Sequence, residues 1–137
     1  MGRHENFPEG REFCIGLRDT DLVLDVQGAS TEPGTPIILW TVKHEDNDNQ
    51  KWYYENKQLR NKQTGLILTV PTLSANVAAD QQHSGSNTQK FEHYDYTISA
   101  VDNEDLVLGI LGSPTENARL ALVHRDNDSE LQQWSII

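Results

Sequence analysis

The sequence predicts an all-β domain of the β-trefoil class, and three observations lead to that prediction. A strand-like motif occurs three times along the chain, and a second motif follows each copy. The segments between them are short, rich in Val, Ile, Leu, Tyr and Thr, and bounded by turn residues, which is typical of short strands. No stretch keeps an apolar spacing of 3.6 residues over several turns, so we expect helices to be short or absent.

The two motifs recur with one period. The first is a Leu-rich strand, with copies at 22–26, 66–70 and 106–110 that begin 44 and 40 residues apart. The second is a Gln-x-aromatic triplet at 50–52, 89–91 and 132–134, whose aromatics are 39 and 43 residues apart. Since two independent markers keep a period of about 40 residues, the chain is predicted to be an internal threefold repeat.

Three repeats of this length suit a trefoil better than a propeller, because three blades are too few to close a propeller. We expect repeats at about 10–54, 55–94 and 95–137, packed into a single domain that spans residues 1–137. Each four-stranded unit alone would expose its apolar face to water, so the three units must pack against one another.

Composition narrows the classes of function. The chain of 137 residues carries a formal net charge of −10, which argues against nucleic acid or an anionic membrane as a partner. No apolar run approaches the roughly 20 residues of a membrane span, so membrane insertion is not expected. Cys14 is the single cysteine and is predicted to be a small core residue. Without a recognisable secretory signal, we expect a cytoplasmic or non-classically secreted protein.

The threefold Gln-x-aromatic pattern resembles the ricin B-type (R-type) lectins, and most closely the single-domain galactose-binding members of invertebrates and fungi. The resemblance runs from about residue 12 to residue 137. It implies that the triplet glutamines tie loop to strand by hydrogen bonds and that the triplet aromatics pack into the core. These structural residues are Gln50, Trp52, Gln89, Phe91, Gln132 and Trp134.

The same resemblance implies a sugar pocket in the first repeat. Family pockets use an Asp at the end of the Leu-rich strand, an aromatic some fifteen residues later and an Asn before the triplet, and Asp25, Trp40 and Asn49 occupy these positions. Lys43 would border the pocket and Ile38 would form its floor, whereas Gln50 would act from behind the residues that touch the sugar.

The chemistry of these residue types fits a pyranose. Its face of C–H groups stacks on an indole, here that of Trp40, and its hydroxyls need directional partners such as a carboxylate and an amide. Asp25 and Asn49 would hold the 3- and 4-hydroxyls. An axial 4-hydroxyl leaves one continuous C–H face, so the resemblance implies galactose or N-acetylgalactosamine.

The corresponding positions of the other two repeats are predicted to be non-functional. In the second repeat Thr69 replaces the Asp, Thr88 replaces the Asn, and counting back twelve residues from Phe91 puts Ala79 at the aromatic position. In the third repeat Gly109 and Leu131 replace the Asp and the Asn. The sequence at 124–128 is similar to that at 44–48, but two extra residues then precede the triplet, so the third repeat can be aligned with the first in more than one way. The candidates for its aromatic position are Leu120, Leu122 and Val123.

Two other classes of function remain as alternatives. Trefoils of this size also act as protease inhibitors through surface loops, for which 27–36, 71–76 and 111–117 are the candidates. A protein-interaction module without sugar binding is the other. We expect no enzymatic activity, no cofactor and no metal, because the Asp-rich run 46–48 lacks the Gly and distal Glu of a calcium loop. Because the sequence predicts one intact sugar pocket per chain, each chain is expected to bind its glycan weakly. The protein is expected to be either a homodimer, which gains from two linked pockets, or a weakly binding monomer.

Overall fold

The computed structural model describes residues 6–137, and its architecture is the predicted β-trefoil. Residues 1–5, on which the expectation about a secretory signal depends, lie outside this range. The helices in the described chain are four 3-10 turns of three residues each. None of the helices within residues 6–137 has the length and hydrophobicity of a membrane span.

The strands fall into three consecutive groups. The first group is β1 (Ile15–Leu17), β2 (Leu22–Val26), β3 (Ile37–Thr41) and β4 (Trp52–Glu55). The second is β5 (Gln58–Asn61), β6 (Ile67–Thr69), β7 (Val77–Ala78), β8 (Asp80–Gln82) and β9 (Phe91–Tyr94). The third is β10 (Thr97–Ala100), β11 (Asn103–Ile110), β12 (Leu120–His124) and β13 (Trp134–Ile136). The 3-10 turns are η1 (Gln27–Ala29), η2 (Asp48–Gln50), η3 (Asn87–Gln89) and η4 (Glu130–Gln132).

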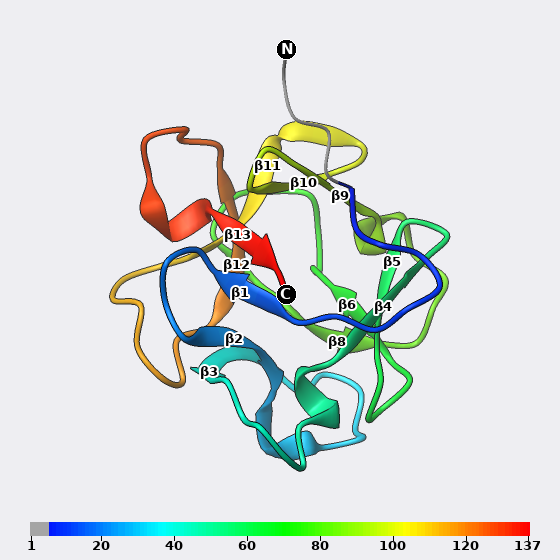
Figure 1. The fold of residues 1–137 in the computed structure, drawn as a ribbon. Coiled ribbons are helices and arrows are strands. Elements are labelled where there is room, and N and C mark those ends of the chain that lie inside the picture. The colour runs from blue at the N-terminus through cyan, green and yellow to red at the C-terminus, as the bar shows by residue number, and fades with distance from the viewer. Residues whose placement is uncertain (1–5) are drawn as a thin grey trace.

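Each sheet joins strands of neighbouring repeats. The sheet orders are β13-β1-β2-β3, β4-β5-β6-β8 and β7-β12-β11-β10-β9. The strand that starts at each triplet aromatic therefore pairs with the first strand of the next repeat, and β13 returns to β1 to close the ring. Figure 1 shows the three groups arranged around a common centre, with the C-terminal strand beside β1.

The triplet aromatics lie in the core, as predicted. Trp52, Phe91 and Trp134 are fully buried and belong to one hydrophobic cluster. The indole N–H of Trp134 donates to the carbonyl of Leu108 at 2.9 Å, and that of Trp52 donates to the carbonyl of Leu24 at 3.4 Å. A buried indole needs such a partner for its N–H group. Cys14 is also buried, with a free thiol.

The triplet glutamines make the same pair of contacts in all three repeats. The side-chain amide of Gln50 donates to the carbonyl of Thr41 at 3.1 Å, and its oxygen accepts from the backbone N–H of Lys43 at 2.9 Å. Gln89 likewise donates to the carbonyl of His83 and accepts from the backbone N–H of Gly85. Gln132 donates to the carbonyl of His124 and accepts from the backbone N–H of Asp126. Each glutamine thus fixes the loop that follows its strand, and the contacts show which residues correspond.

This correspondence corrects one prediction and resolves another. Thr41, His83 and His124 are equivalent, so the residue before each occupies the aromatic position: Trp40, Gln82 and Val123. Ala79 was the wrong assignment, because the segment up to the triplet is three residues shorter in the second repeat than in the first. Ala79 is instead fully buried in the core cluster. The likeness of 44–48 to 124–128 does not reflect equivalent positions.

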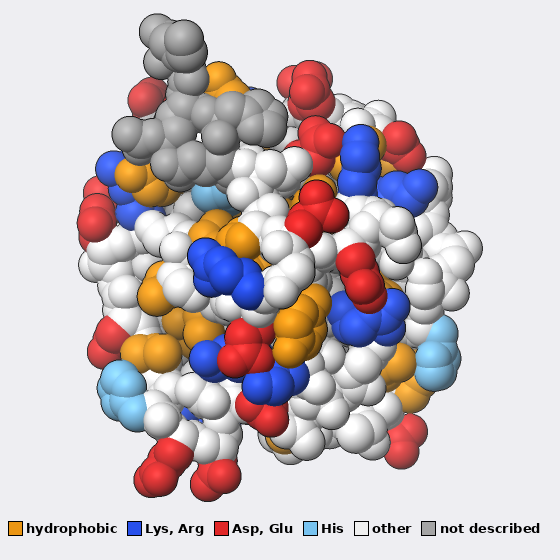
Figure 2. Space-filling model, turned by 45° about the vertical axis from the view of Figure 1, so that its right-hand side comes forward, with side chains coloured by type: hydrophobic (Ala, Val, Ile, Leu, Met, Phe, Trp, Pro, Cys, Tyr) orange, Lys and Arg blue, Asp and Glu red, His pale blue; other side chains and the backbone are white. Residues whose placement is uncertain are grey.

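The surface carries mixed charge. On the face shown in Figure 2, Lys and Arg side chains lie among Asp and Glu, and the hydrophobic areas are small and separate. Ion pairs such as Lys62 with Glu12 at 2.6 Å and Lys57 with Glu92 at 3.2 Å mix the charges locally. Exposed pairs of this kind each contribute about 0–1 kcal/mol to stability, so the fold rests on its core.

Candidate functional site

The structure brings five of the six predicted site residues around one open pocket of about 440 Å³. These five are Asp25, Ile38, Trp40, Lys43 and Asn49. The sixth, Gln50, is fully buried and lies behind Asp25. No cluster of three or more His, Cys, Asp or Glu side chains suited to a metal ion occurs within residues 6–137.

Strand pairing explains the arrangement. β2 and β3 are antiparallel, with Asp25 opposite Ile38 and Val23 opposite Trp40. Because side chains alternate along a strand, Ile38 and Trp40 share the outer face of β3, whereas Ile37 and Leu39 point into the core cluster. Ile38 is buried at the pocket and Trp40 is half-buried, so its indole remains accessible to a ligand.

A hydrogen-bond network orients the carboxylate. Oδ1 of Asp25 accepts from the side-chain amide of Asn49 at 3.1 Å, and Oδ2 accepts from that of Gln50 at 3.0 Å. The Asn49 amide also donates to the carbonyl of Val26, and its oxygen accepts from the Lys43 ammonium at 3.0 Å. Since a carboxylate has about four acceptor sites, these two contacts leave Asp25 able to accept from two hydroxyl groups.

The environment also affects the charge of Asp25. Asp25 as a whole is only 3% exposed, and this burial raises the pKa of its carboxyl above the ordinary value of 3.8. The hydrogen bond from Gln50, the positive charge of Lys43 and the hydrogen bond from Asn49 oppose that rise. Ionising this group therefore costs more in the folded protein than in water, and Lys43 and the two amides support the ionised form.

A ligand that donates hydroxyl hydrogen bonds to Asp25 is expected to bind more weakly in mild acid. A protonated Asp25 loses acceptor sites, so affinity falls as the pH drops through its raised pKa, beginning at a higher pH than the ordinary value of 3.8 would give. The effect of pH on folding stability has the opposite sign. Because the pKa of Asp25 is raised in the folded state, this group favours folding at low pH, and that contribution is lost as the pH rises through its pKa. Calorimetric titrations from pH 7 downward, with circular dichroism to verify folding, would check this. An affinity that stays constant down to about pH 4 would contradict it.

Four lining residues were missed from the sequence: Gln27, Gly28, Ala29 and Asn117. The first three form η1, directly after β2, where Gly28 and Ala29 have φ of 62° and 54° and bend the chain beside the pocket. In the sequence, this turn is indicated by Gly28, which follows Asp25 by three residues. Asn117 comes from the third repeat, and spacing within the first repeat gives no signal for it. These residues belong to two of the loops considered for protease inhibition, 27–36 and 111–117.

The equivalent positions in the other repeats hold different groups. In the second repeat the Thr69 hydroxyl accepts from Gln89 and donates to the carbonyl of Ile67, with Gln82 at the aromatic position. In the third repeat a Cβ added to Gly109 would lie 2.9 Å from Cγ2 of Val123. No acidic side chain fits at Gly109 without displacing its neighbours, and neither repeat places an aromatic at the position of Trp40.

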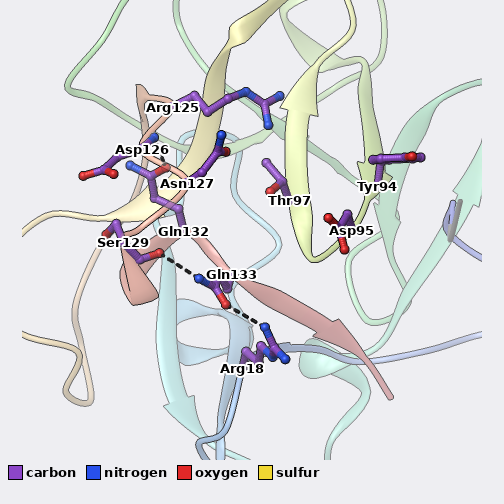
Figure 3. Close-up of a pocket in the computed structure, with 10 residues that line it drawn as sticks. All are labelled: Arg18, Tyr94, Asp95, Thr97, Arg125, Asp126, Asn127, Ser129, Gln132 and Gln133. Carbon is purple, nitrogen blue, oxygen red and sulfur yellow. Dashed lines mark hydrogen bonds between the residues drawn. The ribbon is translucent and has the colours of Figure 1, made fainter. Parts of the chain in front are cut away.

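A second pocket lies against the third repeat, between the β9–β10 hairpin and the loop 125–133, with a volume of about 430 Å³. Arg18 lies at its edge, stacked 3.7 Å from the centre of the Tyr96 ring and bonded to Gln133 at 2.9 Å. Figure 3 shows that the Tyr94 ring points away from the other labelled side chains. This pocket thus has polar groups but lacks the inward-facing indole beside a carboxylate that distinguishes the pocket at Trp40.

Known proteins share the sequence pattern and the fold of this chain. The family model described as ricin-type β-trefoil lectin domain matches residues 13–134. Mucoricin of Rhizopus delemar is 50% identical over 50 residues, which are 36% of this chain and 34% of mucoricin. The chain therefore matches about a third of the length of that relative.

Two solved structures have the same fold. The mdaA-1 domain is 30% identical, with a TM-score of 0.88 over 98% of this chain and 93% of that domain. The C-terminal half of an earthworm R-type lectin, solved in complex with GalNAc, is 22% identical, with a TM-score of 0.81 over 94% of this chain and 98% of its own.

Proposed function

Because the chain belongs to the ricin-type β-trefoil lectin family, we propose that this carbohydrate-binding protein recognises galactose or N-acetylgalactosamine through the pocket at Trp40. The observation that carries the proposal is the meeting of an accessible indole with a buried, oriented carboxylate in one open pocket. The earthworm lectin, which has the same fold, was solved with GalNAc, and this agrees with the proposed sugar class.

The pocket offers the two kinds of interaction that a galactose-type sugar needs. The Trp40 indole gives an apolar surface for the continuous C–H face that an axial 4-hydroxyl leaves on the ring. Asp25 has acceptor sites left for two neighbouring hydroxyls, and such charge-assisted hydrogen bonds are the strong ones. Asn49 and Gln50 hold the carboxylate in place, and Lys43 keeps a positive charge beside it. The Asn49 oxygen, which accepts from Lys43, has a second acceptor site for a sugar hydroxyl, so Asp25 and Asn49 together would hold the 3- and 4-hydroxyls.

The test is retention on immobilised lactose, with Asp25→Thr as the variant. The wild type is expected to bind and to be released by free lactose, whereas the variant flows through because it lacks the carboxylate. Threonine is a suitable replacement because Thr69 occupies the equivalent position, where its hydroxyl accepts from Gln89. In the variant the introduced hydroxyl would accept from Gln50 in the same way, so the fold is expected to persist.

Asp102→Thr is the matched control. It removes the same charge from an exposed turn outside the pocket and should leave retention unchanged. A wild-type protein that passes through the column, and gives no signal on an array of galactose- and GalNAc-terminated glycans, would refute the proposed sugar class.

We further propose that the protein acts either as a homodimer, in which two pockets bind together, or as a monomer that binds weakly. A single monosaccharide pocket gives a Kd near millimolar, about −4 kcal/mol, and tight binding to a cell surface then needs several linked sites. Sedimentation velocity and agglutination of cells that display galactose distinguish the two. A strict monomer without agglutination would exclude the dimer.

A further inference from the structure

The pocket at Trp40 includes a residue from another repeat. Asn117 precedes β12 in the third repeat, yet it lines the pocket of the first. Its backbone N–H donates to the carbonyl of Leu39 at 2.9 Å, and the carbonyl of Ala118 accepts from the N–H of Leu39 at 2.9 Å. The backbone of Arg119 forms an isolated antiparallel β-bridge with that of Ile38. The segment 117–119 is therefore fixed along the edge of β3, next to Trp40.

The three repeats show what the backbone requires at this position. Gly34 donates to the carbonyl of Gln81 at 2.7 Å, and Asn76 donates to that of Leu122 at 2.6 Å. These contacts make Gly34, Asn76 and Asn117 equivalent, and their φ angles are 87°, 67° and 73°. Glycine and asparagine are the residues that adopt this left-handed conformation most readily. Glycine at position 34 shows that the backbone needs no side chain there.

The side-chain amide of Asn117 is available to a ligand. Asn117 is exposed, and its side-chain amide makes no hydrogen bond to any residue within 6–137. The side-chain amide of Asn49, in contrast, is held by hydrogen bonds with Asp25, Val26 and Lys43. Of the three equivalent positions, Asn117 is the one whose side chain borders an indole and a carboxylate. Neither folding nor the orientation of Asp25 therefore uses this amide.

We propose that Asn117 is a specificity-determining residue that binds a hydroxyl or acetamido group on the sugar linked to the one stacked on Trp40. This inference rests on the proposed function. The pocket volume of about 440 Å³ falls within the roughly 300–1,000 Å³ of sites that hold drug-sized ligands, which are larger than one pyranose. An amide both donates and accepts, so it suits either group. The site is thus composite, with the first sugar held by the first repeat and the second by the third.

The test compares two ligands and two matched variants. Asn117→Gly keeps the backbone conformation, as Gly34 demonstrates, and removes the amide. It is expected to lower the affinity for lactose about fivefold, the usual effect of losing one hydrogen bond, and to leave the affinity for methyl β-galactoside unchanged. Asn76→Gly makes the same change away from the pocket and should alter neither affinity. Titration calorimetry gives both constants, and circular dichroism verifies the fold of each variant.

The outcomes separate this inference from the proposed function. If the wild type binds neither ligand, the proposed function fails. If the wild type binds both and Asn117→Gly binds both as tightly, Asn117 makes no contact and the inference is wrong. An equal loss for both ligands would also overturn it, because the amide would then contact the first sugar and not the linked one.

Discussion

Replacing Trp40 with glutamine or valine is expected to weaken galactose binding roughly thirtyfold, because truncating a tryptophan at the centre of a binding site costs about 2 kcal/mol or more. The two replacements are those that the chain itself carries at the equivalent positions, Gln82 and Val123. Neither offers a flat surface for the C–H face of a pyranose. Since Trp40 is half-buried on the outer face of β3, the core loses little.

Trp40→Phe is the graded control. A phenyl ring still stacks but covers less of the sugar, so the affinity should fall in the order Trp, Phe, then Gln and Val. Titration calorimetry with galactose measures the affinities, and urea unfolding followed by circular dichroism should give similar midpoints for all four proteins. Equal affinity for the wild type and Trp40→Val would mean that the sugar does not stack on the indole, and the proposed pocket would then be wrong.

Much of the fold was predictable because it repeats. Gln50, Gln89 and Gln132 are all needed to tie a loop to a strand, and the aromatics two residues later all fill the core. A requirement that is met three times leaves a periodic signal in the sequence. The residues gathered at Trp40 were predictable for a related reason, since they lie within one repeat at spacings that the family resemblance supplied.

Positions defined by counting across a loop were less predictable. Counting back from Phe91 assumed a constant loop length and gave Ala79, whereas the hydrogen bonds of Gln89 put Gln82 at the aromatic position. Asn117 shows the same limit in another form, because its approach to Leu39 follows from the packing of the third repeat against the first. The same contact recurs at Gly34 and Asn76, so every repeat carries Gly or Asn at this point, but that pattern alone does not say which pocket the side chain borders.

Replacing Trp134 with alanine is expected to lower the free energy of unfolding by about 3–5 kcal/mol, the usual cost of truncating a fully buried large aromatic. Such a loss is a large part of the about 5–15 kcal/mol that stabilises a typical domain, so the variant is expected to be partly unfolded at physiological temperature. The measurement is chemical denaturation followed by circular dichroism.

The conservative variants Trp134→Phe and Trp52→Phe make the test sharper. Phe91 shows that phenylalanine is tolerated at a triplet position. Each variant loses the indole N–H and the same volume of buried ring, so the difference between the two variants reports their hydrogen bonds. Removing the indole N–H from Trp134 takes from the Leu108 carbonyl a donor that lies at 2.9 Å, at a cost of about 1–3 kcal/mol beyond the lost ring volume. The contact of Trp52 is 3.4 Å long and therefore weaker, so Trp52→Phe should cost less. If the two variants unfold at the same urea concentration, the shorter indole hydrogen bond of Trp134 adds no stability over the longer one of Trp52, and the prediction is wrong.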